Sequence, residues 1–183
     1  MSKVNTSFSD IRKRLILGVG NDVLMDDGIG PRIVNDLQRD LPSDHFTCYQ
    51  TINLGGLEIL EFIRNYDEVV IIDAIKTAGG TPGDVYILTP GDFKETCHLS
   101  SFHDVSFLTA LKLGDKLQYK LPEIIVIIAV EIVEDLCFGE HFSPLVQQRF
   151  EDSYIEIKSF IESFVNRCTP LAELLNYTIE YGK

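Results

Sequence analysis

Apolar residues in this chain occur either in short runs or at helical spacing, and the two patterns alternate along the sequence. The short apolar or alternating runs predict five strands, at residues 15–19, 46–52, 69–72, 84–88 and 124–130. Apolar residues recur every three or four positions in the segments that predict helices, at residues 29–41, 57–64, 104–113 and 144–164. This alternation predicts an α/β fold, a three-layer αβα sandwich with a five-stranded, mostly parallel twisted sheet of the phosphorylase/hydrolase-like kind.

The length of the chain predicts a single domain. It has 183 residues, of which 45% are hydrophobic, enough to form one substantial core. No repeat, low-complexity tract or linker divides it. We therefore expect one domain over residues 1–183 with a core at about 14–165, while residues 169–183 form a tail that the pattern does not place.

Charge and cysteine usage narrow the class of partners. The formal net charge is −12, which argues against nucleic acid or an anionic membrane as a partner. No apolar run approaches the length of a membrane span. The apolar run that follows residues 1–14 is too short for the apolar region of a signal peptide. The four cysteines are widely spaced and form no C-x-x-C pair, as is typical of a reducing compartment. We expect a cytoplasmic protein and a monomer.

The segment LILGVGNDVLMDDGIGPRIVNDL, residues 15–37, reads as a strand, an acidic glycine-rich turn and a helix. The turn begins like the dinucleotide fingerprint G-x-G-x-x-G, but Val23 replaces the third glycine and two acids follow. Asp26 is interpreted as a cap of the helix that follows. Asp27 has two open interpretations, a helix cap or a ligand and acid–base group at the carboxyl end of a central strand.

Two more residues could join Asp27 at the same rim of the sheet. Asp73 comes directly after the β-branched run of residues 69–72, and His103 precedes a predicted helix. Taken singly, Asp73 could be a cap or turn residue and His103 a capping or surface histidine. Together with Asp27 they would make a set of two carboxylates and one imidazole, which suits a borderline divalent ion such as nickel and leaves coordination positions open.

The turn also carries a family resemblance. Residues 18–34, GVGNDVLMDDGIGPRIV, resemble the N-terminal signature of the hydrogenase maturation proteases. The metal-contacting residues of that family carry over onto Asp27 in this turn, Asp73 in IIDAI and His103 in SSFHDVS. Residues 55–60, GGLEIL, resemble a further family segment. In AVEIVED, residues 129–135, Val133 replaces the proline of the family's Pro-Glu.

The resemblance implies an activity, a cofactor state and a partner. Members of the family are endopeptidases, here expected to be of the aspartyl type. They remove a C-terminal extension from the nickel-loaded large-subunit precursor of a nickel–iron hydrogenase. They carry no permanent metal, and Asp27, Asp73 and His103 would contact the nickel of the substrate. Asp27 and Asp73 would be the catalytic residues, either of them serving as general base.

Other catalytic chemistries and one non-catalytic function are alternatives to this interpretation. Cys97 and His98 are adjacent, but a cysteine protease brings its histidine from far along the chain. A permanent zinc site from His98, His103 and a carboxylate lacks the H-E-x-x-H spacing, and no G-x-S-x-G elbow is present. The alternative from another class is a non-catalytic nickel-sensing chaperone or a nucleotide-binding module on the same fold.

Overall fold

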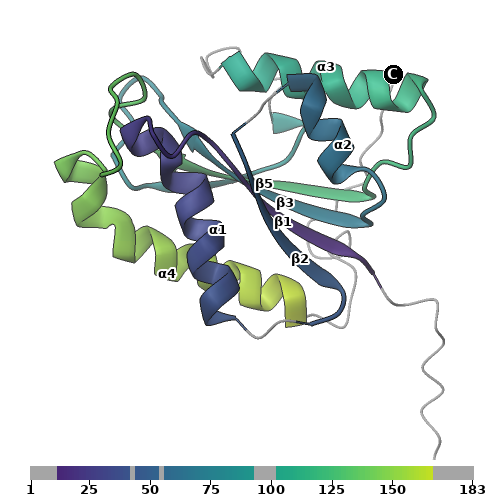
Figure 1. Ribbon diagram of the computed structural model, residues 1–183, viewed down its shortest axis with the longest axis horizontal. Coiled ribbons are helices and arrows are strands. Elements are labelled where there is room, and N and C mark those ends of the chain that lie inside the picture. Colours follow the sequence, from purple (N-terminus) through teal and green to yellow (C-terminus); the bar gives the residue numbers. More distant parts are fainter. Residues whose placement is uncertain (1–11, 42–43, 54–55, 93–101, 167–183) are drawn as a thin grey trace, which may run out of the picture.

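The computed structural model describes residues 12–41, 44–53, 56–92 and 102–166, with the backbone alone for Gly56 and residues 102–106. Five strands form one sheet (Figure 1): β1 (Arg14–Val19), β2 (Thr47–Ile52), β3 (Glu68–Ile75), β4 (Val85–Leu88) and β5 (Ile124–Glu131). The helices are α1 (Ile29–Asp40), α2 (Ile59–Ile63), α3 (Phe102–Lys116) and α4 (Pro144–Asn166). Two 3₁₀ turns precede α1 and α2, namely η2 (Met25–Gly28) and η3 (Gly56–Glu58).

The sheet is parallel except at one edge. Its strand order is β2-β1-β3-β5-β4. β1, β2, β3 and β5 run parallel to one another, while β4 lies antiparallel to β5. The prediction of a mostly parallel sheet is therefore confirmed, and the fourth strand along the chain forms one edge of it.

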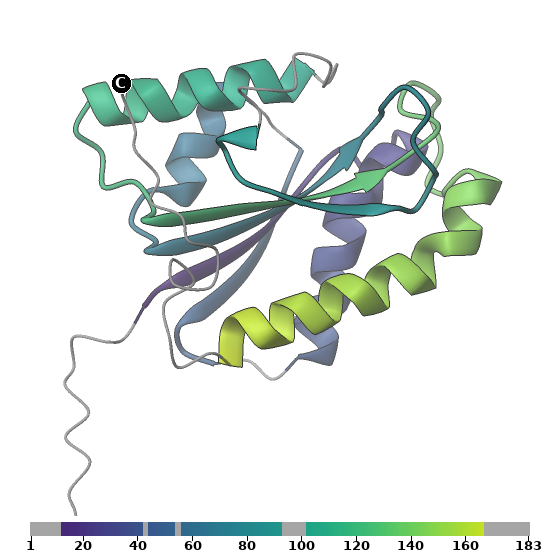
Figure 2. The same cartoon turned by 180° about the vertical axis from the view of Figure 1, so that it is seen from behind.

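Helices cover both faces of the sheet and create two apolar layers (Figures 1 and 2). On one face, the buried side chains of α1 and α4 pack against Ile16, Val70, Ile72, Val126 and Ile128. On the other face, the side chains of α2 and α3 pack against the alternate positions of the same strands. All eight residues of β5 are buried, as expected for a central strand with helices on both faces. This is the predicted three-layer αβα sandwich.

Two of the differences from the predicted element boundaries concern candidate site residues. β3 does not stop before Asp73, because its pairing with β5 continues to Ile75, opposite Glu131. The two residues after the acid, Ala74 and Ile75, are apolar and buried, so the strand gains core contacts by continuing. α3 begins at Phe102, so His103 is its second residue and does not lie in the loop before it. No glycine or proline interrupts residues 102–106.

Other predictions concern residues outside the described part. Cys97, His98 and the tail at residues 169–183 lie outside the described residues, so the interpretations given to them above stay predictions. None of the helices in the described ranges combines the length and the apolar character that crossing a bilayer requires.

Candidate functional site

The order in which successive strands are added to the sheet reverses between β1 and β3, which are neighbours in the sheet. α1 connects β1 to β2 on one face, and α2 then returns to β3 on the opposite face. In sheets of this kind, sites form beyond the carboxyl ends of the strands that flank such a reversal. Asp27 lies in the turn that leaves β1, and Asp73 lies near the carboxyl end of β3. The two candidate carboxylates therefore lie at the carboxyl ends of the two strands where a site is expected.

The turn after β1 is folded around Asp27. Gly20 has a φ of 140°, and a Cβ there would collide with the carbonyl oxygen of Asp27, so only glycine fits. The backbone N–H of Asn21 donates to Oδ2 of Asp27 at 2.7 Å. Asn21 in turn accepts the N–H of Val23 through Oδ1 at 3.2 Å. The motif residues thus fix the Asp27 carboxylate in a half-buried position close to the end of β1.

The same hydrogen bond weakens the nucleotide-binding interpretation. In a dinucleotide fingerprint, backbone N–H groups of the turn face the pyrophosphate. Here the Asn21 N–H is taken by a carboxylate of the chain itself. A pyrophosphate would have to displace that carboxylate and approach its negative charge.

Close packing of α1 on the strands brings the turn against β3. A Cβ on Gly30 would collide with the carbonyl oxygens of Val19 and Ile72, so the start of α1 lies directly on the ends of β1 and β3. Because of this approach, η2, which carries Asp27, is in contact with β3, which carries Asp73. The structure thus brings together the elements that hold the two carboxylates.

Asp73 and His103 belong to the same face of the sheet. Ile72 and Ala74 point toward α1 and α4, so the alternation of β3 directs Asp73 to the face covered by α2 and α3. Asp73 is half-buried, and its Oδ1 accepts the N–H of Ala74 at 2.8 Å. α3 runs antiparallel to β3 and β5, so its first turn, with His103, lies toward their carboxyl ends (Figures 1 and 2).

The predicted convergence of three side chains stays a prediction. Among the side chains that the structure describes, no group of three His, Cys, Asp or Glu residues is placed to hold a metal ion. His103 is outside that search, because only its backbone is described. The backbone arrangement places its helix on the face of the sheet to which Asp73 points.

Asp26 does not cap α1, contrary to the prediction. Neither η2 nor α1 has a side-chain cap hydrogen bond. The carboxylate of Asp26 is fully buried and accepts four hydrogen bonds from the loop after β5. The donors are the N–H groups of Val133 (3.2 Å), Glu134 (2.9 Å) and Ser143 (2.6 Å), and the Ser143 hydroxyl (2.7 Å). Asp26 thus joins the turn of Asp27 to residues 132–143.

Two further carboxylates, those of Glu131 and Glu134, lie at this edge of the sheet. The sequence patterns did not indicate Glu131. Glu131, buried at the end of β5, accepts the N–H and the hydroxyl of Thr77 at 2.7 and 2.8 Å. A Cβ on Gly80 would collide with the Glu131 carboxylate, so this glycine makes room for it. Glu134 accepts the N–H groups of Leu136 and Cys137, and these bonds lower its pKa. A buried acid at a strand end beside a glycine-rich loop was the available signal for Glu131.

Cys137 is not prepared for nucleophilic chemistry. Its thiol is exposed, and the negative charge of Glu134 is the largest of the effects that raise its pKa. A raised pKa keeps the thiol protonated at neutral pH, whereas a reactive cysteine needs a lowered one.

Two cavities lie beside the turn. One, of about 410 Å³, is lined by residues of the turn, α1 and the segment around His141, and the other, of about 330 Å³, by Gly20, Thr51 and their neighbours. Asp22 and Pro31 line both cavities. Space for another molecule therefore exists next to Asp22 in the turn and Pro31 in the first turn of α1.

Comparison with known proteins decides the family. The family model described as hydrogenase maturation protease matches residues 31–159 of this chain. The chain belongs to the hydrogenase maturation protease family. The family inferred from residues 18–34 is thereby confirmed by a match that begins at Pro31 and extends through the following residues to residue 159.

Two curated relatives are similar to this chain in sequence. The Hydrogenase 2 maturation protease of Escherichia coli is 36% identical over 74 residues, 40% of this chain and 45% of the relative. The hydrogenase expression/formation protein HupD of Thiocapsa roseopersicina is 29% identical over 147 residues, 74% of this chain. The chain covers 61% of the length of HupD.

A solved structure shows the same architecture. The hydrogenase maturating endopeptidase HybD from Escherichia coli superposes with a TM-score of 0.66 and 25% identity. The alignment covers 83% of this chain and 93% of HybD. The [NiFe] hydrogenase maturation protease HybD from Thermococcus kodakarensis, at 22% identity and a TM-score of 0.59, shares the fold.

Proposed function

We propose that this protein is an endopeptidase that removes a C-terminal extension from the nickel-loaded large-subunit precursor of a nickel–iron hydrogenase. Membership of the hydrogenase maturation protease family carries the proposal. The position of Asp27 and Asp73 on contacting elements at the carboxyl edge supports it. The nickel belongs to the substrate and is recognised by this chain through Asp27, Asp73 and His103.

The chemistry follows from the two carboxylates. A cation next to the scissile peptide polarises its carbonyl or lowers the pKa of a water molecule close by. One carboxylate, Asp27 or Asp73, takes the proton of the attacking water and returns it to the leaving nitrogen, while the C–N bond breaks and one water is consumed. Without nickel the cation is missing, so an unloaded precursor is left uncut.

The test is an incubation with nickel-loaded and nickel-free precursors, read by mass spectrometry. We expect a mass loss that equals a C-terminal peptide, only with the loaded precursor. Asp27→Asn, Asp73→Asn and His103→Gln keep the side-chain size and should each lower the cleavage rate by about 100-fold or more.

Glu123→Gln is the matched control. Glu123 is an acid that is 65% exposed at the opposite end of the sheet, and we expect its variant to cut like the unmodified protein. If all three site variants still process the precursor at the normal rate, the site assignment is wrong. If the loaded precursor binds and its mass never changes, the chaperone interpretation replaces the protease.

A further inference from the structure

The loop of residues 132–143 carries large apolar side chains into solvent. Phe138 is 86% exposed and Leu136 is 79% exposed, more than any other large hydrophobic residue in the described ranges. Val133, in the same loop, and Val23, in the turn after β1, are also exposed. Clustered exposed apolar side chains of this size are typical of a binding surface.

Hydrogen bonds join the two segments into one surface. The N–H of Gly139 donates to the carbonyl of Val23 at 3.0 Å, and the N–H of Met25 donates to the carbonyl of Gly139 at 2.8 Å. A Cβ on Gly139 would press on Met25, so glycine permits the close approach. Val23 is therefore held next to the loop that carries Leu136 and Phe138.

The backbone of the loop is ordered by carboxylates. Asp26 accepts the N–H groups of Val133 and Glu134, and Glu134 accepts those of Leu136 and Cys137. The exposed side chains are thus presented on a fixed backbone. Binding through a fixed backbone avoids the entropy of ordering a loop.

The charge around these side chains indicates the chemistry of the partner. Residues 15–31 and 132–143 contain six acids and no lysine or arginine: Asp22, Asp26, Asp27, Glu134, Asp135 and Glu140. Of the cations nearby, Lys76 is bound to Asp135 at 3.0 Å, so that acid is already neutralised, and Arg32 is bound to Asp36 at 3.2 Å. A complementary partner presents apolar side chains together with lysine or arginine.

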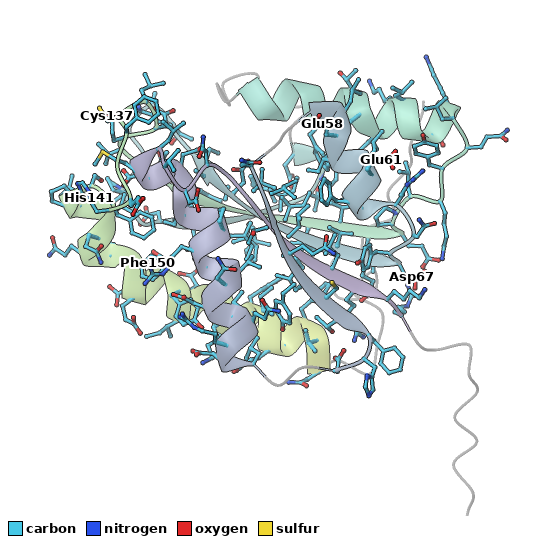
Figure 3. All side chains as sticks on the ribbon, in the orientation of Figure 1. Glu58, Glu61, Asp67, Cys137, His141 and Phe150 are labelled. Atoms are coloured by element: carbon cyan, nitrogen blue, oxygen red, sulfur yellow. The ribbon has the colours of Figure 1, made fainter. Side chains whose placement is uncertain are left out.

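We propose that Val23, Val133, Leu136 and Phe138 form a docking surface that binds an apolar, basic patch of the hydrogenase large-subunit precursor next to the segment that is cut. The inference rests on the proposed function and extends it to the partner. Its position favours this occupant over an unrelated protein, since Asp26 connects the loop directly to the turn of Asp27. A precursor that docks here has its cut segment beside the candidate carboxylates. Figure 3 shows Cys137 and His141 of this loop together at one end of the molecule.

The test separates binding from cleavage with the nickel-loaded precursor as the probe. We expect the double variant Leu136→Ser/Phe138→Ser to weaken precursor binding at least tenfold by calorimetry. Its KM should rise by a similar factor with kcat unchanged, because only docking is lost. Raising the salt concentration should weaken binding to the unmodified protein, because of the charge complementarity.

Two matched variants complete the design. Leu117→Ser removes an equally large apolar side chain that is 52% exposed at the end of α3, and it should bind and cut normally. Asp27→Asn should fail to cut the precursor even at saturating precursor concentration, a loss of kcat that the double variant does not show.

Each outcome bears on one proposal or the other. Unchanged binding and KM in the double variant would overturn the docking surface and leave the protease function intact. If the unmodified protein binds the precursor without cutting it and the double variant loses that binding, the docking surface is supported and the protease function is overturned. A dimer of this chain that dissociates in the double variant would assign the surface to a second copy and refute the inference, and a protein that neither binds nor cuts the precursor would refute both proposals.

Discussion

The two ends of the parallel strands hold their carboxylates in different ways. At the amino ends, acids pair with cations: the buried Glu68 lies 3.0 Å from Arg14 and 3.7 Å from Arg12, and Asp67 lies 2.8 Å from Lys120. At the carboxyl ends, Asp26 and Glu134 accept backbone N–H groups. Figure 3 shows the two ends at opposite sides of the molecule, with Asp67 at one and Cys137 at the other.

The difference concerns net charge. An acid paired with arginine or lysine forms a nearly neutral unit, which is suited to joining strands and little suited to attracting a ligand. Backbone N–H dipoles stabilise a carboxylate without cancelling its charge. At the carboxyl end, Glu134 thus keeps its negative charge in an ordered arrangement, although its neighbour Asp135 is paired with Lys76, and such a charge suits a cation or a basic segment. Ion pairs thus join the strands at the amino end of the sheet, while the carboxyl end holds the candidate site.

The largest expected effect is that of Asp26→Ala. It leaves the buried N–H groups of Val133, Glu134 and Ser143 without their acceptor, and we expect a loss of about 4 kcal/mol in the free energy of unfolding. Urea denaturation measures it. Ser143→Ala removes only the hydroxyl donor and should cost about 1 kcal/mol, so it reports on the same junction if the first variant does not fold.

An Asp26→Ala protein of normal stability would contradict the structural role of that carboxylate. The control in the same segment is Asp22→Asn, whose exposed side chain should change the free energy of unfolding by less than about 0.5 kcal/mol.

The next effect tests the amino end. Glu68→Gln removes the charge opposite Arg14, and we expect it to destabilise the fold by about 2 kcal/mol while precursor cleavage keeps its rate. Thermal unfolding and the cleavage assay are measured on the same preparation. Glu123→Gln is the control, because that acid is 65% exposed and its pair with Arg12 should contribute less than about 1 kcal/mol. A loss of cleavage in stable Glu68→Gln protein would erase the distinction between the two ends.

The smallest effect depends on pH. Burial alone would raise the pKa of Asp67, but Lys120 and the N–H of Lys13 outweigh it and lower the pKa below the ordinary value of 3.8. A lowered pKa stabilises the fold above pH 3.8 and loses that contribution as the pH falls through the folded-state value. Asp67→Asn should therefore destabilise by about 1 kcal/mol at pH 7 and match the unmodified protein near pH 2. Urea midpoints at both pH values measure this, and a constant gap between them would refute it.

Sequence patterns predicted the layers and the order of strands and helices along the chain, because buried positions recur with a regular period in each kind of element. Residues 124–130 are apolar at every position, and β5 is buried on both faces. Boundaries were harder, because Asp73 looked like the end of a strand. Pairing of Ala74 and Ile75 with β5 decides that boundary, and it is a property of two chain segments far apart in sequence.

The site was predictable only where a motif is local. Asn21 and Asp27 are close in sequence, and the turn does hold Asp27 in place through the backbone. Asp26 was misread as a helix cap because its partners at residues 133–143 lie more than a hundred residues away. The same limit explains why the two exposed apolar residues of that loop, Leu136 and Phe138, drew no interpretation before their surroundings were known.

The way residues 132–143 are held has a consequence for variation among relatives. Their hydrogen bonds to Asp26, Glu134, Val23 and Met25 use main-chain groups, which every amino acid except proline supplies. The identity of the side chains at positions 136 and 138 can therefore change without altering the path of the chain. If residues 132–143 contact the precursor as proposed, relatives with other side chains at these two positions would differ in the partner they accept, while the hydrogen bonds that hold the loop stay the same.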